Sequence, residues 1–130
     1  MPVSVPMPMS ELCDRLTIAR LKQQRLTSAQ ADQRDLNAQI AYYMQGVDVS
    51  DFILGDLIHK LEKINGKMWD AEYNIRRGLD DDAPMEEIGR RALVIRELNL
   101  ERIAVKNQIA AHCKQTEFTE VQPHYMRDPT

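Results

Sequence analysis

Seven apolar residues recur at alternating spacings of three and four between positions 54 and 75. This rhythm places one apolar stripe along a helix and is the strongest pattern in the chain. It predicts a helix that begins near Asp48 or Ser50, either of which could cap it, and that ends at Gly78. Asn65-Gly66 lies inside the stripe, and we place it mid-helix because both flanks keep the helical period. The stripe consists of Leu54, Leu57, Leu61, Ile64, Met68, Ala71 and Ile75.

Two further helices flank this one. Apolar residues at helical spacing predict a helix over about residues 11–45, and a second set predicts one over about 84–114. The first helix has a polar stretch near Thr27-Ser28, and Thr27 with Gln30 forms a weak capping box there. We favour a kink at this point over a true break. The fold expected is therefore all-α, an antiparallel bundle of three long helices.

A true break near Thr27 would change the topology. Four helices would bring the C-terminus back towards the N-terminus, so that extended segments at the two ends could pair. Residues 1–9 are predicted to be extended because Pro6 and Pro8 exclude a helix there. Residues 115–130 are predicted to form an extended tail. With 130 residues, the whole chain is expected to be a single helical domain.

The third predicted helix is apolar around most of its circumference. Met85, Ile88 and Ile95 belong to its main face, whereas Leu93 and Leu100 lie on another side. A helix of this kind is either central in its bundle or buried a second time against a partner. We therefore expect a homodimer.

Composition excludes several classes of partner. The formal net charge is −3, so the basic excess typical of nucleic-acid binders is missing. The longest apolar runs fall far short of the roughly 20 residues that a membrane helix needs, and the N-terminus does not read as a secretory signal. Cys13 and Cys113 make neither a disulfide framework nor a metal motif, and this cysteine usage favours the cytoplasm. No motif indicates a cofactor.

A row of polar residues interrupts the apolar face of the third helix. Asn99, Arg102 and Lys106 lie among isoleucines there, and buried cations need partners. Glu11 and Asp14 on the first helix, or Glu72 on the second, are the expected partners. Further cations that could join are Arg15, Lys22 and Arg76.

Two interpretations of this row stay open. One is an ion-pair network that sets the register of the helices. The other is an anion pocket between helices, for a phosphate or carboxylate ligand. We assign no catalytic residue and no metal ligand to the row.

Glu97 and Glu101 stand one helical turn apart and repel each other. Paired helical carboxylates hold Mg²⁺ in all-α nucleotide pyrophosphatases, with further acids such as Glu72 or Asp70 from a neighbouring helix. We favour the simpler interpretation, an exposed face with Arg96 or Arg102 nearby.

Three blocks of the chain resemble a family of small helical proteins of bacteria and some phages that carries only a domain-of-unknown-function label. Its N-terminal signature is approximately P-V-S-x-G-E-L-x-D-K-x-T-I-L-x-I-K, similar to Val3-Ser4-Val5 followed by residues 10–18 and Leu21-Lys22 here. Residues 61–76 and residues 98–125 are similar to its second and third blocks. Met-Pro-Met and Arg15 depart from the signature. The resemblance implies a helical protein without an assigned activity.

We therefore expect a non-enzymatic protein-interaction or assembly module that forms a homodimer. The alternative is a small all-α ligand binder or enzyme with the interhelical anion pocket, for instance one similar to a magnesium-dependent nucleotide pyrophosphatase.

Overall fold

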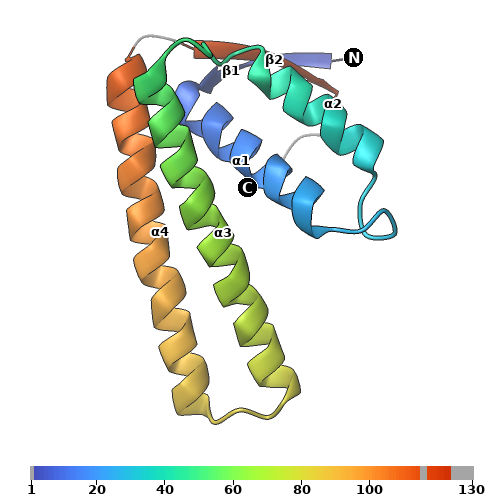
Figure 1. Ribbon diagram of the computed structural model, residues 1–130, viewed down its shortest axis with the longest axis vertical. Coiled ribbons are helices and arrows are strands. Elements are labelled where there is room, and N and C mark those ends of the chain that lie inside the picture. Colours follow the sequence, from blue (N-terminus) through green and yellow to red (C-terminus); the bar gives the residue numbers. More distant parts are fainter. Residues whose placement is uncertain (1, 115–116, 124–130) are drawn as a thin grey trace.

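The structure is a computed structural model that describes residues 2–114 and 117–123. Within these residues the chain forms four helices and a two-stranded antiparallel ribbon (Figure 1). The protein is thus mainly helical, as predicted. The elements in order are β1 (Pro2–Pro8), α1 (Met9–Arg25), α2 (Gln33–Met44), α3 (Phe52–Asp80), α4 (Met85–Cys113) and β2 (Glu117–Pro123).

The prediction of one kinked helix over residues 11–45 is wrong, because α1 and α2 are separate helices. The backbone N–H and the hydroxyl of Thr27 both donate to the side-chain oxygen of Gln30, at 2.9 and 3.2 Å. Asp32 then accepts the N–H groups of Arg34 and Asp35 at 3.0 and 3.3 Å, which starts a new helix. The chain reverses here, so α1 and α2 form a short hairpin and the three-helix bundle is not formed.

The break brings the two ends of the chain together. β1 and β2 pair antiparallel, from Pro2 opposite Pro123 to Pro8 opposite Glu117. β1 lies within the extended segment predicted over residues 1–9, and β2 lies within the tail predicted over 115–130. Residues 1, 115–116 and 124–130 of those segments lie outside the described residues. This is the topology that the four-helix alternative anticipated.

The strongest stripe of the sequence forms α3, and Asn65-Gly66 lies inside that helix as predicted. The cap is one residue later than expected, because the Asp51 carboxylate accepts the N–H of Leu54 at 3.0 Å. Gly66 is buried where α1 crosses α3: a Cβ atom there would lie 3.2 Å from Nη2 of Arg25.

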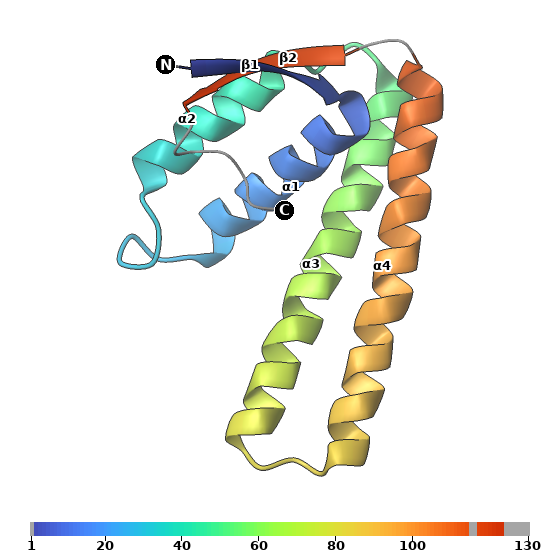
Figure 2. The ribbon, with the colours of Figure 1, turned by 180° about the vertical axis from the view of Figure 1, so that it is seen from behind.

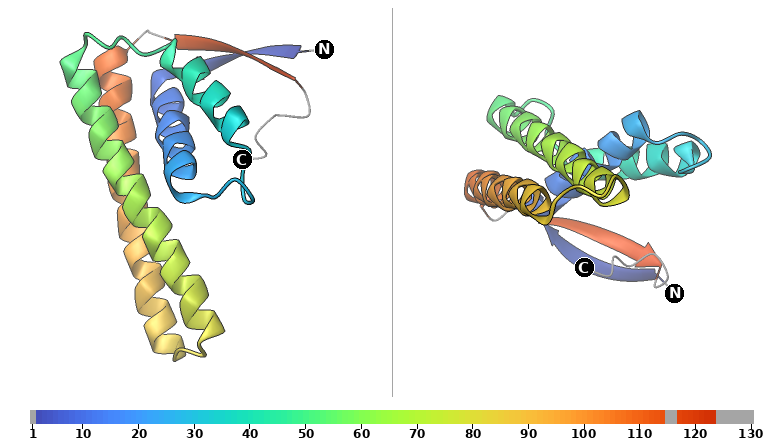
Figure 3. Two further views of the ribbon diagram at one scale, coloured as in Figure 1. Left: turned by 45° about the vertical axis from the view of Figure 1, so that its right-hand side comes forward. Right: turned by 90° about the horizontal axis from the view of Figure 1, so that it is seen from below.

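The apolar core lies at one end of the molecule. α1 packs against the upper part of the long α3–α4 hairpin and α2 lies on α1, so the lower part of the hairpin projects beyond both (Figures 2 and 3). Cys113 at the end of α4 packs against the same cluster that holds Cys13, so the two thiols are at one end of the fold. The buried cluster contains Met7, Met9, Leu12, Cys13, Leu16, Tyr43, Leu54, Ile58, Leu61, Val105 and Ile109.

The third predicted helix is not central. α4 packs on α3 through Leu98, Val105 and Ile109, which are its buried residues. Its other side forms an outer edge of the molecule, where Leu100 is 62% exposed and Leu93 is 55% exposed (Figures 1 and 2). The prediction of a central position is therefore wrong for the single chain.

Candidate functional site

A buried carboxylate lies where α1, α3 and α4 meet. Asp14, on the face of α1 that packs against the hairpin, is only 1% exposed. Arg102 of α4 donates to it through Nε at 3.0 Å and through Nη2, so the guanidinium binds the carboxylate with two parallel bonds. Asn65 of α3 donates a third bond at 3.0 Å. One side chain thus ties three helices together.

Thr17 completes the buried part of this site. The Asn65 amide, which has two N–H groups, also donates to the Thr17 hydroxyl at 2.8 Å. That hydroxyl donates in turn to the backbone carbonyl of Asp14 at 2.8 Å, one turn back along α1. The polar groups of this layer therefore satisfy one another, as buried polar atoms must.

A second, more exposed layer surrounds the first. Lys106 Nζ lies 3.0 Å from a carboxylate oxygen of Glu11 and 3.8 Å from one of Asp14. Arg15 Nε lies 3.5 Å from the other oxygen of Glu11, and Asn99 accepts a 3.4 Å bond from Arg102. We call the two layers together the Asp14 network. It comprises Glu11, Asp14, Arg15, Thr17, Asn65, Asn99, Arg102 and Lys106.

The network keeps its central pair ionised. Burial by itself raises the pKa of the Asp14 carboxyl, but hydrogen bonds from Arg102 and Asn65 and the charges of Arg102 and Lys106 outweigh burial. The pKa of Asp14 is consequently lowered. The hydrogen bond to Asp14 also raises the pKa of the Arg102 guanidinium. Asp14 and Arg102 therefore form a true ion pair at neutral pH.

Of the nine residues named from the sequence, six lie in the network. Glu72 acts on Arg102 only through its charge, and Lys22 and Arg76 lie outside the network. Lys22 points away from the hairpin on the exposed side of α1, and Arg76 lies on α3 below the region that α1 covers. Both are exposed, so the structure does not bring them to the network. Thr17 and Asn65 were missing from the predicted set. Asn65 follows Ile58 and Leu61 at helical spacing, and that spacing was the signal for its burial.

Searches of protein-family models, curated proteins and solved structures find no match to this chain. The resemblance to a family of unknown function stays a prediction, and geometry alone bears on the function.

The cations of the network already have acceptors within the chain. Arg102 donates to Asp14 and Asn99, and Lys106 donates to Glu11. A phosphate or carboxylate ligand would have to compete with these carboxylates. The arrangement is chemically suited to holding three helices in register.

The other candidate groups do not form a reactive constellation among the described residues. Glu97 and Glu101 are both exposed, and no three His, Cys, Asp or Glu residues in 2–114 and 117–123 are grouped as metal ligands would be. Cys13 is fully buried, and burial, with smaller contributions from Cys113 and Asp14, raises the pKa of its thiol to about 12. A thiol with this pKa is a packing residue at neutral pH. None of the described helices could span a membrane.

Proposed function

We propose that this chain is a non-enzymatic protein-interaction or assembly module that works as a homodimer. The observation that carries the proposal is the exposure of large apolar residues on the α3–α4 hairpin. Met85 is 77% exposed, and Leu93, Leu100 and Ile103 on the same helix are 46–62% exposed. Several large apolar residues exposed along one helix are a feature of surfaces that contact other proteins.

The Asp14 network supports the same proposal. The Asp14 network fixes the upper part of the hairpin against α1. The buried charges of the network are paired, and its amide and hydroxyl groups are hydrogen-bonded. The lower hairpin then projects as a fixed surface (Figure 3). A surface held in this way can present its exposed residues to a partner in a fixed orientation.

The proposal includes a cytoplasmic location and a partner that is not a nucleic acid. The two cysteines are free thiols, in keeping with a reducing cytoplasm. The net charge of −3 gives no reason to expect a nucleic-acid partner. Membership of the small bacterial and phage family of unknown function would fit this role, since that resemblance brings no activity with it.

Sedimentation velocity tests the proposal. We expect the mass to rise from that of one 15.0 kDa chain towards twice that value as the concentration increases. A single 15.0 kDa species over the whole range would contradict the homodimer.

One observation favours the alternative of an anion-binding site. Two cations of the network, Arg102 and Lys106, stand one turn apart on α4, and their side chains stay 26% and 22% exposed. Their exposed parts could hold a phosphate or carboxylate ligand at the outer layer. A more specific form, a magnesium-dependent nucleotide pyrophosphatase, would need an acidic cluster that the described residues do not assemble.

Thermal unfolding with inorganic phosphate separates the two candidates. A ligand at 100 times its dissociation constant adds about 2.7 kcal/mol to the free energy of unfolding. Stabilisation that disappears in Arg102→Met, in a variant that still folds, would support the pocket. An unchanged midpoint with phosphate and with small carboxylates would count against it.

A further inference from the structure

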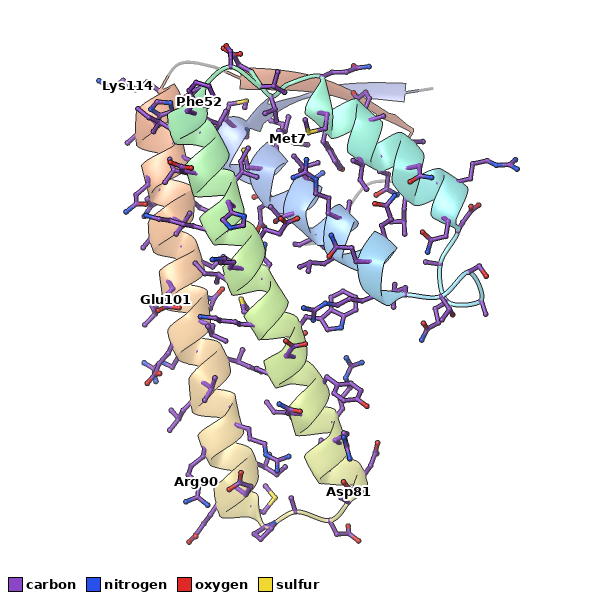
Figure 4. All side chains as sticks on the ribbon, viewed as in Figure 1. Met7, Phe52, Asp81, Arg90, Glu101 and Lys114 are labelled. Atoms are coloured by element: carbon purple, nitrogen blue, oxygen red, sulfur yellow. The ribbon has the colours of Figure 1, made fainter. Side chains whose placement is uncertain are left out.

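The outer side of α4 carries a second helical seam that nothing in the described chain covers. Its residues follow one another at spacings of three and four, as in the seam of a coiled coil. All of them are exposed, and at about 100° per residue they lie on the side of α4 opposite its buried residues Leu98, Val105 and Ile109. Figures 1 and 4 show that α4 forms an outer edge of the molecule. We define the α4 outer seam as Leu93, Arg96, Leu100, Ile103, Asn107 and Ala110.

Reversing the seam places its two polar residues opposite each other. Suppose that two copies of α4 lie antiparallel about a centre between Leu100 and Ile103. Leu100 of each copy then faces Ile103 of the other. Leu93 then faces Ala110, and Arg96 faces Asn107. Every layer pairs apolar with apolar or polar with polar. The Arg96 guanidinium can donate to the side-chain oxygen of Asn107, which has no hydrogen bond to another described residue.

A parallel arrangement also pairs apolar with apolar and polar with polar residues, but it brings equal charges together. Each residue would face its own copy, so that Arg96 would meet Arg96 at the centre of the contact, where like charges are costly. Arg96 makes no ion pair with a described residue in the single chain that could offset this repulsion. The order of residues along the seam therefore selects the antiparallel direction.

The size of the contact fits a reversible dimer. α4 has 29 residues and is about 43 Å long at about 1.5 Å per residue. In this register residues 90–113 of the two copies overlap over about 36 Å, and with helices about 10 Å apart the contact covers roughly 350 Å² on each copy. The total for both copies lies below the roughly 1,200 Å² of stable complexes, so the dimer is expected to be weak and transient.

We propose that the α4 outer seam is the contact between two copies of this chain, packed antiparallel with Leu100 of each copy against Ile103 of the other. This inference rests on the proposed homodimer and adds its surface, direction and register. The long α3–α4 hairpins would then lie side by side with their tips at opposite ends.

Sedimentation equilibrium of single substitutions tests the surface. Leu100→Glu puts a carboxylate of each copy against an isoleucine of the other, and we expect the dimer to weaken by about 100-fold or more. Val94→Glu is the matched control, since Val94 is 48% exposed but lies about 120° around the helix from Leu100. We expect it to leave the dissociation constant within about twofold of the original. Both sites are exposed, and circular dichroism checks that both variants fold.

The outcomes separate this inference from the proposed function. A dimer that resists Leu100→Glu would overturn the seam and leave the homodimer standing. A chain that stays monomeric up to about 200 µM would overturn both. Equal weakening by Val94→Glu and Leu100→Glu would show a general effect of added charge, and that would also overturn the seam.

Disulfide capture tests the direction, in a chain that carries Cys113→Ser and keeps the fully buried Cys13. In the antiparallel register, Leu93 of one copy lies beside Ala110 of the other and about 25 Å from the other Leu93. Oxidising a mixture of Leu93→Cys and Ala110→Cys chains, distinguished by a tag, should give mixed cross-linked dimers. Leu93→Cys alone should give none. Cross-linking of Leu93→Cys to itself would instead show a parallel dimer and overturn the proposed register.

Discussion

The two halves of the α3–α4 hairpin have the same kind of sequence and very different surroundings. In the upper half, α1 packs across both helices, so that Leu61 and Ile109 are fully buried and an ion pair is enclosed. In the lower half, α3 and α4 have only each other, and Leu79 is 56% exposed. Figure 4 shows side chains standing out from both lower helices without cover. A two-helix hairpin can bury only one apolar stripe of each helix. Packing of α1 across both helices encloses these stripes and forms a core.

The largest expected difference between the halves comes from a leucine deletion. Leu61→Ala leaves a cavity in the core and should lower the free energy of unfolding by about 3–4 kcal/mol. Leu79→Ala removes a mostly exposed side chain and should cost less than about 1 kcal/mol. Urea denaturation of dilute protein measures both. Equal losses would mean that the lower half is covered in solution.

The buried ion pair should come next. Asp14→Asn removes the charge that compensates Arg102 and should cost about 3 kcal/mol, because the guanidinium is left partly buried and unpaired. Glu87→Gln is the control in the lower hairpin, where Glu87 pairs with Arg90 and Arg91 at the surface. We expect a loss of only a few tenths of a kcal/mol there. A small loss in Asp14→Asn would contradict the locking role of the Asp14 network.

The buried Asp14 carboxylate should make the folded protein sensitive to acid. The pKa of Asp14 is lowered in the folded state, so the unfolded chain takes up a proton at this site before the folded chain does. The stability from this group is fully present above the unfolded pKa of about 3.9 and is lost as the pH falls through the lower folded pKa. Measuring the free energy of unfolding from neutral pH downwards should show a steeper acid decline in the original chain than in Asp14→Asn. Parallel profiles would show that other carboxylates dominate.

Glycines provide the smallest and sharpest comparison. A Cβ atom at Gly55 would meet nothing within 4 Å, whereas one at Gly78 would lie 2.5 Å from Nη1 of Arg91 and 2.7 Å from Cδ1 of Ile88. Gly55→Ala should stabilise the protein by about 0.5–1 kcal/mol through helix propensity. Gly78→Ala should lose that gain, because the two side chains must move and Arg91 donates to the Asn74 carbonyl. Equal gains in thermal unfolding would show that the lower helices separate easily.

Much of the helical content could be predicted from the sequence. The stripe from Leu54 to Ile75 forms α3, and the second set of helical spacings forms α4. These elements follow from bonds between residues four apart, so local pattern is enough. The partners of Arg102 and Lys106 were also foreseeable, since buried cations require carboxylates and α1 carries two on one side. Asn65 was harder to assign, because its role depends on an aspartate 51 positions away.

The sequence by itself determined where helices can form, which faces are apolar, and that a few charges must find partners. Tertiary structure decided that residues 26–32 turn rather than bend, that the chain ends pair as β1 and β2, and that α4 lies at an edge. Those outcomes depend on contacts between distant residues, such as Asp14 and Arg102, which are 88 positions apart. Local bonds at Thr27 allow a kink or a turn. The turn is favoured over the kink because it lets α1 pack on the hairpin and α2 pack on α1. This packing buries the core and pairs its charges, which lowers the free energy of the folded chain.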